Sequence, residues 1–565
     1  MTGHRTRAVA VATALGAAVY GLTAAPCATA ADTTGNPSDK ATSYVVVAAD
    51  TGSVAAAKQA VTSAGGTVTS EDAELGILTA TSSATDFAAK ADASAAVSGV
   101  AGDRRIGAVP RADPLKRDLR DSVPVARRPA RGPLPKAEPL ADLQWDMAMI
   151  NATPSGSYRK QPGSRQVRVG IIDTGVDGNH PDIKPNFDKA LSRNFVTDIP
   201  SLDGECEQPS CVDPVDTDDN EHGTHVAGTI GASINGVGIA GVAPNVTLVN
   251  IRAGGDAGSF FLEPTLKAIR YAGQAGIDVV NMSFYIDPWL FNCAANSADS
   301  PEEQREQRAV IEATQRALTY AHRRGVTLVA ALGNDHLDLG SPPVDKISPN
   351  HPAGAAHERT IDNSTCLSLP AEGRHVIGVA SVGKSGKKAD YSNHGTEQTD
   401  VAAPGGFLRD FAGTDASRQP GNLVLAPMPH HLAVRSGLID ATTGESKDPF
   451  LVSSCGAPGP ESCAYWQYLQ GTSMAAPHVA GVAALIVSQY GRPDGRGGKT
   501  LDPDVVDRVL RGTAIDKICP APVISYKAEG RGATYGSPCT GTPARNSIYG
   551  DGVVDALAAV GGPRR

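Results

Sequence analysis

The sequence predicts an α/β protein, a parallel sheet with helices on both faces, preceded by a small ferredoxin-like α+β unit. Two observations predict this architecture. In the long second part of the chain, short apolar runs of strand length alternate with helical stretches, which is typical of a parallel sheet covered on both faces. The first part instead follows the order β-α-β-β-α-β, which matches a ferredoxin-like unit.

The composition agrees with a folded protein of more than one unit. The chain has 565 residues, of which 41% are hydrophobic and 20% charged, as in globular proteins. A chain of this length exceeds what one hydrophobic core usually organises. Its 51 Lys and Arg against 60 Asp and Glu give a net charge of -9, which argues against a nucleic-acid partner because phosphate backbones attract basic surfaces.

Residues 1–30 follow the pattern of a secretory signal peptide. Arg5 and Arg7 precede the apolar stretch 8–22, and small residues lead up to Ala30, after which we expect cleavage. The alternative is a membrane anchor, but the stretch is shorter than the roughly 20 residues that a spanning helix needs. We therefore expect a secreted, extracellular protein that is not attached to a membrane.

The cysteines predict disulfides rather than a metal centre. Nine are present, and eight remain once Cys27 leaves with the signal peptide. An even number in an oxidising compartment is typical of disulfide bonding, and the sequence has no CxxC motif or Cys/His cluster. Short separations favour three pairs and leave one more, which gives Cys206–Cys211, Cys455–Cys463, Cys519–Cys539 and Cys293–Cys366.

The small first unit and a linker are expected over residues 31–140. Strands are predicted at 44–47 and within 75–80 and 99–109, and helices over 54–61 and 86–97. The end of this part is rich in Pro and Arg, which is typical of a cleavable linker. We expect the main domain to occupy residues 141–565.

In the main domain, five apolar runs are each long enough for a buried strand, at 167–172, 246–251, 277–282, 326–331 and 376–381. Helical stretches separate several of them, notably 263–274 and 301–324, the second with Pro301 in its first turn and Gly325 after its end. In such folds, functional side chains gather at the carboxyl ends of the strands.

Three polar motifs lie where such a site is expected. Asp173 follows the first strand in Asp-Thr-Gly, His222 opens His-Gly-Thr-His-Val-Ala-Gly, and Ser473 lies in Gly-Thr-Ser-Met-Ala-Ala-Pro at a helix start. A serine hydroxyl needs a base to take its proton, and that base needs an acid to orient it and to stabilise its charge. Each residue alone also fits a turn or capping role. Together they predict a nucleophile (Ser473), a general acid/base (His222) and an orienting acid (Asp173).

In these motifs the chain resembles the subtilases, the subtilisin-like serine proteases, over roughly residues 144–560. The order Asp, His, Ser distinguishes this family from chymotrypsin-like enzymes and α/β-hydrolases. The resemblance implies a subtilisin-like sheet and a secreted bacterial zymogen. Residues 31–140 would then be a propeptide that inhibits the peptidase domain. His225, the second histidine of its motif, is expected to be structural.

The resemblance also implies the remaining parts of a peptidase site. Asn334 and the backbone N–H of Ser473 are expected to stabilise the oxyanion. An extended substrate is expected to pair its backbone with two segments, Gly258-Ser259-Phe260 and Ser283-Phe284-Tyr285. Gly333 is also expected to contact the substrate. Tyr285 departs from the family, which usually has glycine there, so we expect its ring to shrink or redirect the primary specificity pocket.

Two further expectations concern charged and polar groups. No cofactor is expected for catalysis, but by resemblance Gln144, Asp182 and Asn235 would hold a structural calcium ion through oxygen ligands. An acidic run before the catalytic histidine is either a solvated loop or a negative subsite that prefers Lys or Arg in the substrate. Its members are Asp213, Asp216, Asp218, Asp219 and Glu221.

The leading hypothesis is a secreted serine endopeptidase that forms an acyl-enzyme, cleaves peptides or proteins as a monomer, and matures by autoprocessing. One alternative is a subtilase-fold binding protein without turnover, which a missing triad residue would favour; none is missing. The other is a selective processing protease, favoured by Tyr285, the acidic run and long insertions at 288–301, 335–374 and 405–470.

Overall fold

The computed structural model describes residues 41–102, 105–108, 138–286, 288–341, 344–349, 354–495 and 497–561, with 105–108 described by their backbone alone. The chain divides into two units, residues 1–40 and 41–565, and the first unit lies outside the described residues together with the expected signal peptide. No helix in the described part of the chain combines the length and apolar character that crossing a bilayer requires.

The expected ferredoxin-like unit is confirmed. Its four strands form an antiparallel sheet in the order β2-β3-β1-β4, made of β1 (Thr42–Ala48), β2 (Thr67–Asp72), β3 (Ile77–Ser82) and β4 (Val97–Gly102). Helices α1 (Val54–Ser63) and α2 (Phe87–Asp92) connect them and bury their apolar side chains in a separate small core. The second helix ends at Asp92 and not at residue 97 as expected, because β4 already begins at Val97.

The main sheet has seven parallel strands in the order β18-β17-β13-β10-β6-β8-β7. The five expected runs form β6 (Arg168–Ile172), β8 (Thr247–Arg252), β10 (Val279–Met282), β13 (Thr327–Ala331) and β17 (Val376–Val382). Two strands that the sequence analysis did not predict extend the edges, β7 (Arg193–Asn194) and β18 (Val401–Pro404). The five predicted strands are almost entirely buried, as their predominantly apolar sequences predict.

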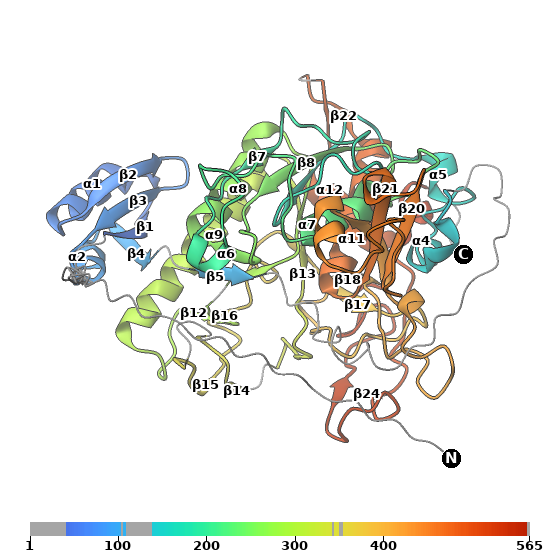
Figure 1. The fold of residues 1–565 in the computed structure, drawn as a ribbon. Helices are drawn as coiled ribbons and strands as arrows, with labels where there is room; N and C mark the ends of the chain where they lie inside the picture. The colour runs from blue at the N-terminus through green and yellow to red at the C-terminus, as the bar shows by residue number, and fades with distance from the viewer. Residues whose placement is uncertain are drawn as a thin grey trace, which may run out of the picture. The chain divides into compact units, whose positions relative to one another are not determined.

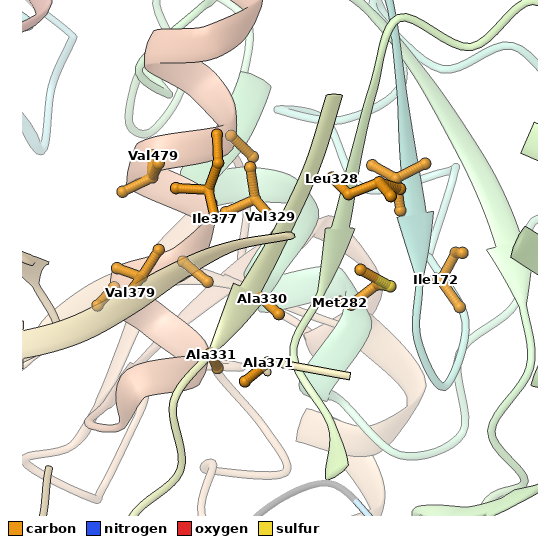
Figure 2. Close-up of a cluster of buried hydrophobic side chains, with 14 of the residues drawn as sticks. Ile172, Met282, Leu328, Val329, Ala330, Ala331, Ala371, Ile377, Val379 and Val479 are labelled. Carbon is orange, nitrogen blue, oxygen red and sulfur yellow. The ribbon is translucent and has the colours of Figure 1, made fainter. Parts of the chain in front are cut away.

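Helices cover both faces of this sheet (Figure 1). On one face lie α8 (Leu262–Ala275) and α9 (Pro301–Arg323), which pack against each other. Both helices begin and end within one residue of the predicted bounds. Ser300 and Glu303 form a capping box at the start of helix α9, and Pro301 is its first residue. On the other face, α7 (His222–Gly231) packs against α11 (Thr472–Tyr490), whose Val479 joins the cluster of strand side chains shown in Figure 2.

The strand β5 (Arg105–Ala108) leaves the small unit and joins the main domain. It pairs antiparallel with β9 (Ser259–Phe261) on one side and with β11 (Tyr285–Ile286) on the other. Ala108 lies opposite both Ser259 and Tyr285 in these registers. The segment 99–109, within which strand structure was expected, thus contributes to β4 and to β5, and most of the Pro/Arg-rich linker, at 109–137, lies outside the described residues.

All four expected disulfide pairs are present. The longest link, Cys293–Cys366, joins β12 (Asn292–Cys293) to β16 (Cys366–Leu367) across the insertion that follows β11. A later insertion forms a three-stranded sheet in the order β19-β21-β20, with strands β19 (Val424–Met428), β20 (Leu451–Cys455) and β21 (Cys463–Leu469). Both insertions are therefore folded additions rather than open loops.

Candidate active site

Asp173 and His222 form a buried pair at the carboxyl edge of the main sheet. Asp173 follows β6, and its carbonyl accepts two N–H groups from the chain after β8. His222 is the first residue of α7, and its Nδ1 lies 2.8 Å from Asp173 Oδ1. This contact fixes the ring so that Nε2 is the nitrogen left to accept a proton. The Nε2 atom is buried and has no hydrogen-bond partner among the described residues.

The pKa of His222 is raised above its ordinary value. Burial by itself works against the protonated ring, but the charge and hydrogen bond of Asp173 outweigh it, with smaller contributions from Asp218 and Glu221. The pKa of neighbouring His225 is instead lowered to about 3 by burial, and its Nε2 contacts the Val424 carbonyl at 3.1 Å. His225 is therefore a neutral packing residue, as its place in the motif suggested.

Asp218 positions the start of α7, a role that the sequence analysis missed. Its fully buried carboxylate accepts hydrogen bonds from Asn220 and Glu221 N–H, from Thr224 N–H at 2.9 Å and from the Thr224 hydroxyl at 2.6 Å. Because these groups surround His222 in the chain, the carboxylate holds the backbone that carries the imidazole. A capping Asp four residues before the motif histidine was the available signal.

Ser473 lies in the first turn of α11, which side chains from distant segments hold in place. Pro477 has no N–H, so the Ser473 carbonyl lacks its usual helical donor four residues on. The Ser283 hydroxyl donates to that carbonyl instead, at 3.1 Å. The Ser473 hydroxyl in turn donates to the Ser283 carbonyl, at 3.4 Å, and not to His222 Nε2. Such nucleophile–base contacts often tighten only when substrate binds.

Two hydrogen-bond donors face a common space beside Ser473. The Asn334 Oδ1 accepts both the N–H and the hydroxyl of Thr472, each at 2.9 Å, which leaves its Nδ2 to donate elsewhere. The Ser473 N–H lies too early in α11 to have a helical acceptor. A Cβ added to Gly471 would lie 3.4 Å from Asn334 Nδ2 and 3.5 Å from Ser473 N. Gly471 therefore keeps open the space between the donors, where an oxyanion can bind.

Asn393 holds the turn that carries Asn334. Its Nδ2 donates to the Leu332 carbonyl at 2.9 Å, and its Oδ1 accepts the N–H groups of Asp335 and Leu337. Gly333, with φ of 102°, fits against this amide, because a Cβ there would lie 2.5 Å from Asn393 Nδ2. A glycine at position 333 thus allows the turn to pack against the Asn393 amide.

The two expected substrate-binding segments flank β5. Gly258 has a left-handed φ of 72° and turns the chain into β9, whereas Ser283 and Phe284 lead into β11 at Tyr285. The Phe260 and Phe284 rings are buried and stack on each other with centroids 4.3 Å apart. These stacked rings join the two segments that flank β5. Because both rings are buried, residues 260 and 284 offer backbone groups rather than their side chains to a peptide.

The acidic run matches neither interpretation made from the sequence. Four of its carboxylates are buried or partly buried and are bound within the protein, by Arg252 (Asp213), Lys189 (Asp216), the start of α7 (Asp218), and His431 with Arg435 (Asp219). His431 and Arg435 belong to the insertion after residue 405, which no local pattern could pair with the run. The run is neither a solvated loop nor a free negative subsite.

Gln144, Asp182 and Asn235 come together, but as placed they do not fit a calcium ion. Gln144 Oε1 accepts the Ala240 N–H, and Asn235 Oδ1 accepts the Val237 N–H. Asp182 Oδ2 accepts the indole N–H of Trp466 at 2.8 Å and the Ile239 N–H at 3.0 Å. Burial raises the pKa of Asp182 to about 6. The calcium ligands stay a prediction, and in this arrangement protein N–H donors bind an oxygen of each of the three residues.

Comparison with known proteins agrees with the geometry. The profile of the subtilase family matches residues 164–552. The epidermin leader peptide-processing serine protease EpiP of Staphylococcus epidermidis is 28% identical over 356 residues, which cover 62% of this chain and 66% of that protein. The thermophilic serine proteinase of Bacillus sp. (strain AK1) is 29% identical over 328 residues, 58% of this chain and 53% of that protein. The aligned part thus spans between half and two thirds of these relatives.

A solved structure shares the fold. The crystal structure of EpiP from Staphylococcus aureus superposes with a TM-score of 0.59 at 22% sequence identity, over 92% of this chain and 98% of that one. The likeness extends over nearly the whole chain. The subtilisin-like parallel sheet expected from the motifs is therefore confirmed.

The arrangement around Asp182 predicts a domain whose stability does not depend on calcium at this position. Thermal unfolding of the mature protein should give the same midpoint in excess calcium and in excess chelator. Trp466→Phe should lower the midpoint, because loss of the indole donor leaves a buried carboxylate underbonded at a cost of about 1–3 kcal/mol.

Tyr468→Phe, on the same strand, is the control and should change stability less. A midpoint that falls on chelation and recovers specifically with calcium, together with loss of this response in Asp182→Asn, would contradict the assignment.

Proposed function

Because this chain belongs to the subtilase family, we propose that it is a secreted serine endopeptidase made as a zymogen, with Asp173, His222 and Ser473 as its catalytic triad. The observation that carries this proposal is the buried Asp173–His222 pair at 2.8 Å at the start of α7, a helix that packs against α11, whose first turn contains Ser473. The proposed organisation is a signal peptide at 1–30, a propeptide with linker at 31–140 and the peptidase domain at 141–565.

In the proposed reaction, Ser473 Oγ attacks the scissile carbonyl while His222 Nε2 takes its proton. Asp173 stabilises the imidazolium through Nδ1, in agreement with the raised pKa of His222. Asn334 Nδ2 and the Ser473 N–H bind the oxyanion. His222 then gives the proton to the leaving amine, and water releases the acyl group by the reverse sequence of proton transfers.

The position of β5 supports the zymogen part of the proposal. A strand between β9 and β11, paired with both, lies as an extended substrate would lie. The small unit that precedes it docks on α8 and α9, through Thr79 with Glu263 at 3.0 Å and Arg316 with the Leu75 carbonyl at 3.2 Å. We propose that the linker after β5 is cleaved by the enzyme itself.

A selective processing protease remains a second candidate function. The relative EpiP is named for processing the epidermin leader peptide. In this chain, Tyr285 pairs with β5 and is only partly buried, and a folded insertion with buried Trp289 and Phe291 follows β11. Bulky residues and ordered insertions around a cleft narrow the range of peptides that fit it.

Replacement of the nucleophile tests the function directly. Ser473→Ala, expressed without other proteases, should remain an unprocessed precursor and should not react with a fluorophosphonate probe, because both events need the hydroxyl. Ser488→Ala, a buried serine further along α11, is the control and should be processed and labelled normally. Normal maturation of Ser473→Ala would refute autoprocessing, and continued labelling would refute the nucleophile.

A methyl group at Gly471 should block the oxyanion space. Gly471→Ala should lower kcat/KM by about 10² to 10³, because its Cβ lies between the two donors. Gly421→Ala, where an added Cβ meets no atom within 4 Å, is the control. Steady-state kinetics on folded, active-site-titrated enzyme measure the effect, and an unchanged kcat/KM in Gly471→Ala would contradict the placement of this space.

Tyr285→Gly tests the specificity pocket. If the ring enters the pocket, kcat/KM for substrates with large P1 side chains should rise relative to small ones by about tenfold, or 1.4 kcal/mol of differential transition-state binding. We expect this result. If the ring instead packs with the Trp289 and Phe291 insertion, the ratio stays constant and the unfolding temperature falls, which would refute a pocket role.

A further inference from the structure

A buried pair of side chains connects the beginning of the main domain to the helix of the nucleophile. Asp146 lies in α4 (Trp145–Met149), and His478 lies in α11, five residues after Ser473. His478 Nε2 is 3.1 Å from Asp146 Oδ2, and His478 Nδ1 is 2.7 Å from the Met474 carbonyl. Both side chains have no exposed surface. None of the steps of the proposed reaction uses them.

The hydrogen bonds determine how many protons the pair holds. A carbonyl oxygen only accepts, so Nδ1 must donate to Met474. An ionised carboxylate also only accepts, so Nε2 must donate to Asp146, which makes the ring an imidazolium. The alternative, a neutral ring that accepts from a protonated Asp146, contains the same number of protons. In either form a shared proton joins the two residues inside the protein.

The surroundings of the pair provide no competing charge that the structure places beside the ring. On α7, burial lowers the pKa of His225 to about 3, so that ring is neutral. On α5 (Ser157–Lys160), burial and the charge of Asp146 raise the pKa of Tyr158, whose hydroxyl donates to the Gly241 carbonyl at 2.8 Å. Asp146 is therefore the partner that balances a charge on His478.

We propose that Asp146 and His478 are a positioning pair for Ser473, an inference that rests on the proposed function. Thr472 and Ser473 already depend on Asn334 and Ser283 for hydrogen bonds at the start of α11. The His478 ring binds the next carbonyl, that of Met474, and Asp146 holds the ring from outside the helix. The first turn of α11 is thereby anchored to α4, the first α-helix described after the linker.

Three variants separate this role from a general contribution to folding. Asp146→Asn can still bridge, because a neutral ring that donates from Nδ1 can accept the amide N–H at Nε2. Asp146→Ala cannot. Tyr158→Phe removes a buried hydrogen bond nearby without contact to His478, and it is the matched control. Catalytically active enzyme of each variant is counted by fluorophosphonate titration, with trace wild-type enzyme added for maturation where needed and then removed.

Asp146→Ala should lose about tenfold or more in kcat per titrated site with KM nearly unchanged, since displacement of a nucleophile affects the chemical step. Asp146→Asn should recover most of that loss, and Tyr158→Phe should lower only the unfolding temperature. A wild-type kcat per site in Asp146→Ala would overturn the proposal. So would an Asp146→Asn enzyme as impaired as Asp146→Ala.

A readout that does not need activity keeps the two proposals distinguishable. In ¹⁵N-histidine-labelled Ser473→Ala protein, the His478 ring should show an Nδ1 proton protected from exchange, which should lose its protection in the Ser473→Ala/Asp146→Ala double variant. Failure of the proposed function would appear as wild-type protein that no fluorophosphonate labels. Protection that persists without Asp146 would overturn the positioning pair, whether or not the enzyme is active.

Discussion

The first turn of α11 is the element on which the rest of the site depends. Pro477 deprives the Ser473 carbonyl of its helical donor, and the Ser283 hydroxyl after β10 supplies the missing bond. Asn334, after β13, fixes Thr472 immediately before the nucleophile. Because these partners follow neighbouring strands of one parallel sheet, the position of Ser473 depends on the strand register. The packed core beneath the site thus limits how far the nucleophile can move.

Buried charges around the site are paired in small networks that make its borders rigid. Arg252 binds Asp198, Asp213 and Asp256 next to the chain that leads into β9. In the insertion after β13, fully buried Arg359 binds Asp345 of the same insertion and Asp299 of the insertion after β11. Removing one partner of such a network costs about 3–5 kcal/mol, because the remaining charge stays buried. These ion pairs therefore tie the described parts of the added segments to one another and make them part of the folded domain.

Local sequence signals predicted the five central strands of the main sheet, the bounds of α8 and α9 and three of the disulfides, because each depends on residues close together in the chain. The runs around Val279 and Val329 had the length and apolar character of buried strands, and Pro301 with Gly325 indicated the bounds of a helix. What the sequence could not predict comes from contacts between distant segments. Trp466 bonds to Asp182 across 284 positions of the chain, so that an indole N–H reaches a carboxylate that the sequence suggested as a cation ligand. Motif spacing has no access to such a partner.

The pairing of β5 with β9 and β11 has a consequence for activation. In the proposed zymogen, these segments recognise backbone, so they would bind a substrate by the same kind of hydrogen bonds that pair them with the chain's own strand. Pairing over a few residues is weak alone, but the docked small unit, which also contributes the ion pair of Asp72 with Arg270, keeps β5 at a high effective concentration. Under the proposed autoprocessing, cleavage of the linker would make this binding intermolecular, so that loss or degradation of the small unit would free the cleft. Inhibition and its release would then require no change in the geometry of the proposed catalytic residues.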